Sequence, residues 1–254
     1  MRRAAHLAYG AYAYLVFAVF GLSALVAALV VPGLERRRII VRKAARLFLL
    51  CARMPLTVKG LERLPEGQCI VVANHASYLD GVVFTAALPP RFSFVIKREM
   101  ARVPLAGPML SRIGAQFIER FDRQRATADA RRLLRKAERG ESMVFFPEGT
   151  FAARPGLLRF HSGAFHTAAR AGCPVVPAVI RGTRRALPPD RILPRAETIS
   201  VELLPAIIAS SLIDPSPEGS AQAASASHLA AAELRERARS AILSRLTEPD
   251  LEVA

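Results

Sequence analysis

An apolar stretch without any charged residue runs from Leu7 to Val31 near the beginning of the chain. As a helix its 25 residues would be roughly 37 Å long, which exceeds the ~30 Å hydrocarbon core of a bilayer. A signal peptide has a shorter apolar core of about 7–15 residues and a small-residue cleavage site, whereas this stretch ends at Pro32-Gly33. We therefore predict a retained membrane anchor, which either spans the bilayer or inserts into one leaflet.

A second helical pattern follows Gly33 and carries many basic residues. Apolar residues recur there at spacings of three and four, namely Ile40, Ala44, Leu47, Phe48 and Cys51. The basic residues around them are Arg36, Arg37, Arg38, Arg42, Lys43 and Arg46. The pattern is typical of an amphipathic helix on anionic headgroups, and almost as much of a core helix in the domain that follows. Because Arg2 and Arg3 precede the apolar stretch and more basic residues follow it, the positive-inside rule predicts a body on the cytoplasmic face of the inner membrane.

From Pro55 onward, strand-like and helix-like stretches alternate along the chain. The predicted strands are Cys69–Ala73, Phe92–Ile96, Ala115–Ile118, Ser142–Phe146, Val175–Ile180 and Thr198–Leu204. The predicted helices are Ser77–Leu88, Leu105–Arg112, Thr127–Arg139 and Gly163–Ala171. This alternation predicts an α/β fold with a mixed, largely parallel sheet flanked by helices. In such sheets, ligands bind where strands end in loops.

The composition changes after Asp214, where Pro, Ser, Gly and Ala dominate through Ser227 and predict a linker. Helical periodicity returns from His228 to Leu246. We therefore divide the chain into N-terminal membrane-anchoring helices (1–54), an α/β domain (55–210) and a linker with a C-terminal helix (211–254).

The formal net charge of +15 favours a polyanionic partner. Nucleic acid is a poor candidate, because the chain has no zinc-finger spacing, no tryptophan and only four tyrosines for base stacking. The densest basic cluster directly follows the apolar stretch, which favours an anionic membrane surface instead. The three cysteines are far apart and odd in number, which argues against a disulfide framework or a zinc site and favours a reducing compartment.

A histidine follows the predicted strand at Cys69–Ala73, in the segment Asn74-His75-Ala76-Ser77-Tyr78-Leu79-Asp80. A histidine at a strand end is a candidate general base if a carboxylate fixes its tautomer and offsets the charge of the imidazolium. On a regular helix, the side chains of His75 and Asp80 would lie about 140° apart, so their pairing requires a strand, a turn and then a helix. Ser77 and Asp80 also match a helix-capping box, which leaves a purely structural role for Asp80 open.

A second candidate segment, Phe146-Pro147-Glu148-Gly149-Thr150, also follows a predicted strand. Gly149 allows close approach of the backbone to a ligand, and Thr150 adds a hydroxyl donor, so the N–H groups of this loop can bind a phosphate or an oxyanion. A carboxylate would repel phosphate. We therefore expect Glu148 to bind a hydroxyl of the ligand or a nearby arginine.

Two further segments have weaker signals. In Gly114–Arg120, the arginine follows a short strand and can hold a phosphate with two N–H groups, although a solvated surface arginine is the commoner case. In Val176–Ile180, Pro177 interrupts an apolar run that otherwise has the pattern of a buried strand.

Taken in order, the segments NHASYLD, GAQFIER, FPEGT and VPAVI resemble the four motif blocks of the glycerolipid acyltransferase family. That family includes 1-acylglycerol-3-phosphate and lysophospholipid acyltransferases. Further matches are Lys97-Arg98-Glu99 before the second block and Phe160-His161-Ser162-Gly163 after the third. The resemblance covers residues 55–205, approximately, and departs from the family at His161, where relatives often have a lysine.

The resemblance implies that His75 and Asp80 are the catalytic pair. The residues that it implies to bind substrate are Lys97, Gly114, Arg120, Glu148, Gly149, Thr150 and Pro177. It also implies the reaction: transfer of an acyl chain from acyl-CoA or acyl-carrier protein to the free hydroxyl of a lysophosphatidate-type acceptor in phospholipid synthesis. Membrane lipids and the acyl donor are then the partners. No cofactor beyond the donor and no metal site are expected.

Other functions stay open at this point. The acceptor can instead be glycerol 3-phosphate, another lysophospholipid or lyso-ornithine lipid. A lipid hydrolase would use the same pair to activate water, but the chain lacks the G-x-S-x-G elbow of that class. A non-catalytic basic membrane adaptor would leave the ordered motifs unexplained. The sequence does not determine the oligomeric state.

Overall fold

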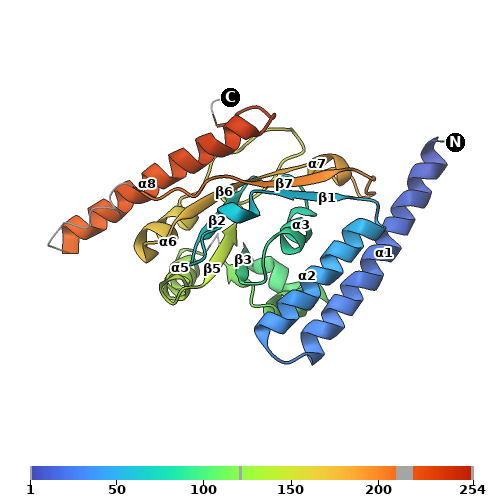
Figure 1. The fold of residues 1–254 in the computed structure, drawn as a ribbon, viewed down its shortest axis with the longest axis horizontal. Coiled ribbons are helices and arrows are strands. Elements are labelled where there is room, and N and C mark those ends of the chain that lie inside the picture. The colour runs from blue at the N-terminus through green and yellow to red at the C-terminus, as the bar shows by residue number, and fades with distance from the viewer. Residues whose placement is uncertain (1, 120–121, 210–219, 253–254) are drawn as a thin grey trace.

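A seven-stranded sheet forms the centre of the molecule, with the strand order β1-β7-β6-β2-β5-β3-β4 (Figure 1). The computed structural model describes residues 2–119, 122–209 and 220–252. The strands are β1 (Leu56–Lys59), β2 (Ile70–Ala73), β3 (Phe92–Lys97), β4 (Gln116–Ile118), β5 (Ser142–Phe145), β6 (Val175–Arg181) and β7 (Ile199–Leu203). All neighbouring strands pair in parallel except β6 and β7, which are antiparallel. The predicted mixed, largely parallel sheet is therefore confirmed.

Helices cover both faces of this sheet (Figure 1). They are α1 (Arg2–Val30), α2 (Leu34–Cys51), α3 (Asp80–Ala87), α4 (Ala106–Arg112), α5 (Arg123–Glu138), α6 (Gly163–Ala171), α7 (Thr183–Ala186) and α8 (Ser220–Arg245), with short 3-10 helices at Leu61–Arg63 and Arg98–Arg102. One core cluster joins α2 and α3 to one face, and a second joins α5, α6 and α8 to the other. Because β2 is covered on both sides, all four of its residues are buried, and its sequence is continuously apolar rather than alternating.

The first two helices form an antiparallel hairpin beside the sheet (Figure 1). The hydroxyl groups of Tyr9 and Tyr12 donate hydrogen bonds to the carbonyl oxygens of Ala52 (2.7 Å) and Cys51 (2.8 Å). The predicted apolar helix is present, and by length and composition the 28 residues from Arg3 to Val30 could cross a membrane. Its large apolar side chains that remain exposed include Leu7, Leu15, Val19, Leu22, Val26 and Leu29.

One face of α2 belongs to the core of the domain, so the prediction of a core helix for this segment is confirmed. That face is displaced by about one residue from the predicted one and consists of Val41, Ala45, Phe48 and Leu49. The displacement leaves Leu47 and Leu50 exposed. The hairpin is therefore packed on the α/β body by one side and presents apolar side chains on another.

Part of the basic cluster on α2 binds carbonyl groups of the domain. The sequence had favoured a role in binding lipid headgroups for this cluster. Arg42 and Arg46 donate to the carbonyl oxygens of Ala87 (3.5 Å) and Ala86 (2.8 Å). These carbonyls end α3, where the last turn of a helix leaves its oxygens unpaired and the helix dipole is negative. Arg38 donates to Ser93 Oγ and to the carbonyls of Pro90, Arg91 and Ile113.

Several predicted boundaries were wrong. The helix predicted from Ser77 begins at Asp80, because Ala76 to Leu79 form a turn whose N–H groups bind side chains rather than carbonyls of a preceding helical turn. The helix predicted from Thr127 begins at Arg123, since Asp122 accepts hydrogen bonds from two backbone N–H groups and caps it.

The predicted linker through Ser227 was also wrong in its second half, where α8 already begins at Ser220. Four alanines among residues 220–227 favour a helix more strongly than the serines oppose it. The first part of that linker, after Asp214, falls among residues 210–219, which lie outside the described residues. The edge strand β1 and the one-turn helix α7 were not predicted.

Candidate active site

The strands β2 and β5 are adjacent and parallel, and their following helices cover opposite faces of the sheet. The helix α3 after β2 belongs to one core cluster, and α6 after β5 belongs to the other. By the general rule for α/β proteins, a divergence of this kind marks the carboxyl ends of the two strands as the expected ligand-binding crevice. His75 and Glu148 lie two and three residues beyond the ends of these strands, so both are at the expected crevice.

His75 and Asp80 form the pair that the sequence predicted. The distance from His75 Nδ1 to Asp80 Oδ2 is 2.8 Å. The turn from Ala76 to Leu79 makes this contact possible, because it brings the first residue of α3 back beside the end of β2. With Nδ1 donating to the carboxylate, Nε2 is the ring nitrogen that is left to accept a proton.

Asp80 is fully buried and unusually rich in hydrogen bonds at one oxygen. Its Oδ2 accepts the backbone N–H groups of Ala76 (2.6 Å) and Ser77 (2.9 Å) as well as the His75 ring. Its Oδ1 is buried and has no hydrogen-bond partner among the described residues. The bond from Ser77 N is half of the capping box that the sequence suggested, so Asp80 stabilises the turn and orients the imidazole at the same time.

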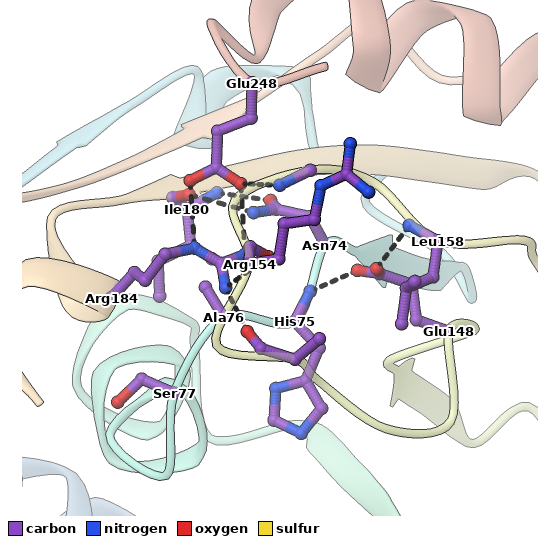
Figure 2. Close-up of polar contacts among 12 residues, drawn as sticks. Asn74, His75, Ala76, Ser77, Glu148, Arg154, Leu158, Ile180, Arg184 and Glu248 are labelled. Carbon is purple, nitrogen blue, oxygen red and sulfur yellow. Dashed lines mark hydrogen bonds and ion pairs between the residues drawn. The ribbon is translucent and has the colours of Figure 1, made fainter. Parts of the chain in front are cut away.

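Glu148, in the loop after the neighbouring strand β5, binds the backbone of His75 (Figure 2). Its Oε1 accepts the backbone N–H of His75 at 2.6 Å, and its Oε2 accepts the backbone N–H of Leu158 at 2.8 Å. The carboxylate is therefore bound to backbone groups rather than to an arginine, which corrects one of the two expectations from the sequence. The side chain joins the turn after β2 to the loop after β5.

Burial raises the pKa of Glu148 to about 7, against two backbone hydrogen bonds and the charge of Arg184, which lower it. A carboxyl whose pKa is higher in the folded state stabilises the fold at acidic pH, and this contribution is lost as the pH rises from about 4.5 to 7.

We therefore expect a Glu148→Gln variant to lose less stability than the wild type between pH 5 and pH 8. At about 1.4 kcal/mol per pH unit, the difference between the two changes is on the order of 3 kcal/mol. Thermal unfolding of both proteins in detergent across this pH range measures it. Parallel pH dependences of the two melting temperatures would show that Glu148 does not titrate in this range.

Two phenylalanines surround the imidazole. The Phe146 ring stacks on it with centroids 4.4 Å apart, and the Phe151 ring meets it edge-on, also at 4.4 Å. Tyr78 in turn contacts Phe151 edge-on at 4.8 Å and is exposed. Asp80 and the two phenylalanines consequently contact the ring of His75 on three sides. The His75 side chain is 19% exposed.

The remaining predicted site residues are placed as follows. Gly149 has a φ of 72°, which favours glycine, and Thr150 beside it is exposed at the same loop. Lys97 is exposed at the carboxyl end of β3, one strand beyond β5. Arg120 lies outside the described residues.

Two predicted residues have clear structural roles. Gly114 has a φ of 78° at the end of α4, and a Cβ there would lie 2.9 Å from Arg38 Nη2. Pro177 lies within β6. Ala178 pairs with Leu203 and Val175 pairs with Ile207, so the chain after β7 has one residue more than β6 between these two pairs, opposite Pro177. This bulge accommodates a residue that has no N–H to donate.

The sequence did not identify Arg184 and Glu248. They form an ion pair at 3.0 Å and lie 64 residues apart in the chain (Figure 2). Arg184 belongs to the unpredicted helix α7, and Glu248 follows α8, so no local pattern signals their contact. Asn74 was quoted only as part of the first motif, yet its side chain exchanges two hydrogen bonds with the backbone of Ile180 and joins the ends of β2 and β6.

Fold and site together define an α/β protein with a histidine–aspartate pair at the carboxyl end of a central strand in a largely parallel sheet. The family model described as Acyltransferase matches residues 55–181, half of the chain. The chain therefore belongs to the acyltransferase family.

Several relatives of this chain have related names. The 1-acyl-sn-glycerol-3-phosphate acyltransferase of Escherichia coli strain K12 is 30% identical over 189 residues, which are 74% of this chain and 71% of that protein. A chloroplastic enzyme of the same name from Brassica napus is 34% identical over 133 residues, or 52% of this chain and 38% of the relative. The lyso-ornithine lipid O-acyltransferase of Pseudomonas aeruginosa is 34% identical over 143 residues, or 55% of this chain and 53% of the relative. The chain thus spans only 38% of the Brassica napus protein.

The fold has a solved counterpart. The crystal structure of the 1-acyl-sn-glycerophosphate (LPA) acyltransferase PlsC from Thermotoga maritima matches with a TM-score of 0.69 over 93% of this chain and 98% of that chain. The sequence identity is 23%, so this likeness concerns the fold alone.

Proposed function

We propose that this protein is an O-acyltransferase that esterifies the free hydroxyl of a lysophosphatidate-type lipid and so makes phosphatidate. The observation that carries the proposal is the 2.8 Å contact between His75 Nδ1 and Asp80, which leaves Nε2 available at the crevice. Membership of the acyltransferase family and the names of the relatives from Escherichia coli and Brassica napus support the reaction and the acceptor.

In the proposed reaction, His75 Nε2 takes the proton of the acceptor hydroxyl while its oxygen attacks the carbonyl carbon of a thioester. General-base assistance of this kind contributes about 10²–10⁴-fold to a rate. Asp80 offsets the positive charge that develops on the imidazole. When the tetrahedral intermediate collapses, the carbon–sulfur bond breaks, and the thiolate takes the proton back from the imidazolium. The donor is an acyl-CoA or an acyl-carrier protein, and no acyl-enzyme forms.

The acceptor headgroup is proposed to bind along the carboxyl edge of β5, β3 and β4. Thr150 offers a hydroxyl donor there, and Lys97 supplies positive charge. The N–H of Gly149 instead donates to the carbonyl oxygen of Phe146 at 3.0 Å and gives the loop its turn. Arg120, which lies outside the described residues, is proposed to add a second positive charge because it follows β4 closely in the sequence. Glu148 takes part by holding the loop, and its proposed contact with an acceptor hydroxyl would use the accepting capacity that its carboxylate retains beside the two N–H groups.

An acyl-transfer assay with defined acceptors tests this function. The purified protein is given a radiolabelled acyl-CoA or acyl-carrier protein together with lysophosphatidate, glycerol 3-phosphate or lyso-ornithine lipid. We expect phosphatidate as the main product. Preferential acylation of lyso-ornithine lipid would move the protein to the function named for the Pseudomonas aeruginosa relative. Release of free fatty acid, with no acylated acceptor, would refute acyl transfer in favour of hydrolysis.

The hairpin of α1 and α2 is proposed to attach the protein to the membrane. Contacts along α1, from Tyr9 to Ala28, pack one side of this helix on α2 and the body. A helix that is packed along one side against a body carrying arginines cannot be surrounded by lipid. Insertion of the exposed apolar side into one leaflet is therefore favoured over a separate span, and it keeps the crevice near lipid substrates.

We expect a Leu15→Glu/Leu22→Glu double variant to bind anionic liposomes at least about 10²-fold more weakly than the wild type, because each leucine loses burial and gains charge. The two side chains are 65% and 57% exposed in the structure, so the fold should survive. Leu229→Glu is the matched control, since Leu229 is 69% exposed on α8. Equal sedimentation of all three proteins with liposomes would show that this face of α1 does not bind lipid.

A further inference from the structure

The segment that follows α8 pairs through its backbone with the loop that follows the Glu148 motif. Leu157 N donates to the carbonyl of Pro249 at 2.9 Å, and Leu251 N donates to the carbonyl of Leu157 at 3.0 Å. These bonds form a short parallel bridge between Leu157 and Asp250. Gly156 allows the approach, because a Cβ at this position would lie 2.3 Å from Leu251 Cγ. The loop between the third motif and α6 is thus bound by residues far along the chain. Gly156 and Glu248, for example, are 92 positions apart in the sequence.

Arg239 holds this C-terminal segment in place. Its guanidinium pairs with both carboxylate oxygens of Asp250 and with Glu252 Oε2 at 2.8 Å, and its side chain is only 9% exposed. The hydrogen bonds from Arg239 lower the pKa of Asp250 to about 2, so this carboxylate is ionised at any pH at which the protein would work. The segment is therefore an ordered part of the fold and can position other groups.

Arg184 and Glu248 connect the segment to the loop at its other end (Figure 2). Arg184 Nε and Nη2 donate to the two oxygens of Glu248 at 3.1 and 3.0 Å. Arg184 Nη1 donates to the carbonyl oxygens of Ala152 and Arg154 in the loop. Glu248 Oε2 in addition accepts the N–H of Gly156 at 2.8 Å. One ion pair, whose arginine side chain is 11% exposed, thus binds the loop at three backbone positions.

The bound stretch lies between two residues that contact the catalytic histidine or its support. Phe151, immediately before Ala152, packs edge-on against the His75 ring. Leu158, shortly after Gly156, donates its N–H to Glu148, whose other oxygen accepts the N–H of His75. A displacement of the loop would therefore move one wall of the imidazole and release one bond of the carboxylate that holds the His75 backbone.

We propose that the Arg184–Glu248 ion pair is a positioning device for His75 and for the acceptor-binding loop. Neither side chain touches the reacting groups, and both act through Phe151 and through the hydrogen bond from Leu158 to Glu148. The inference rests on the proposed function, because it assigns the pair to the same reaction. It concerns residues outside the four motif blocks.

Substitution of the pair tests the inference. We expect Arg184→Met to lower kcat by about 10–100-fold, since displacements on the order of an ångström at a reacting pair have effects of this size. Glu248→Gln keeps the shape and loses the charge, so a smaller loss is expected. Because the two residues act as one unit, the double variant should lose no more than Arg184→Met alone. Arg185→Met is the matched control: this neighbouring arginine forms an exposed ion pair with Glu197 and should retain wild-type kcat within about twofold.

Hydrogen exchange of the backbone amides gives a readout that does not depend on activity. In Arg184→Met, the amides of His75, Gly156 and Leu158 should exchange at least about 10-fold faster, whereas those of β2 and β5 should remain as protected as in the wild type. Unchanged kcat together with unchanged exchange in the loop would overturn the inference. Faster exchange throughout the sheet, with activity lost only in proportion to unfolded protein, would overturn it as well, because the pair would then be merely structural. Absence of acyl transfer by the wild type would instead refute the proposed function, while the exchange data would still report on the contact.

Discussion

Replacing His75 with alanine is expected to lower kcat/KM for acyl transfer by about 10³-fold or more. The variant lacks the nitrogen that removes the proton of the acceptor hydroxyl, and no other titratable side chain contacts Asp80 Oδ2 in the part of the chain that the structure describes. Residual activity would come from binding the two substrates next to each other. Initial rates with acyl donor and lysophosphatidate, measured at saturating and limiting acceptor, give both kinetic constants.

The structure also indicates why this variant should stay folded. The backbone N–H of His75, which Glu148 accepts, is unaffected by the substitution. Removal of the ring opens space between Phe146 and Phe151 at the surface of the crevice rather than in either core cluster. His228→Ala provides the control, since His228 is exposed on α8 and contacts only His166 among the aromatic rings described. Turnover by His75→Ala close to that of the wild type would exclude a role of this imidazole as the base.

Local patterns predicted the sheet and the central pair because their signals lie within short segments. The continuous apolar run of β2 and the breaks on either side of it reflect burial on both faces, so the strand end at Ala73 could be placed before His75. The five-residue spacing to Asp80 then required a turn, and the structure has one at Ala76 to Leu79. The ordered motif blocks added specificity that no single block has.

Contacts between distant segments were beyond such patterns. The buried face of α2 and the use of Arg38, Arg42 and Arg46 on domain carbonyls depend on how the hairpin packs, which periodicity does not specify. A charged residue near an apolar stretch has the same pattern whether it faces headgroups or the end of α3. The contacts of Glu148 and the pairing of Arg184 with Glu248 likewise arise only when the chain is folded.

Asp80→Asn is expected to lower kcat by about 10²–10³-fold with only a modest loss of stability. The two oxygens of Asp80 have different surroundings, since Oδ2 accepts three N–H groups and Oδ1 has no partner among the described residues. An asparagine can place its carbonyl oxygen where Oδ2 lies and its amide nitrogen where Oδ1 lies. The opposite orientation would set the amide against the N–H groups of Ala76 and Ser77, so it is disfavoured. The His75 tautomer is then retained, and what is lost is the negative charge beside the developing imidazolium.

This substitution separates the two roles of Asp80, because the hydrogen bonds that stabilise the turn remain while the charge is removed. An unpartnered buried amide costs about 1–3 kcal/mol, so the melting temperature should fall by only a few degrees. Asp80→Ala is the comparison: it leaves three donors without an acceptor and should lower both the melting temperature and the activity further. kcat values and melting temperatures of the three proteins decide the matter. If Asp80→Asn kept kcat within a few-fold of the wild type, Asp80 would be a capping residue of α3, and the histidine would act without help from its charge.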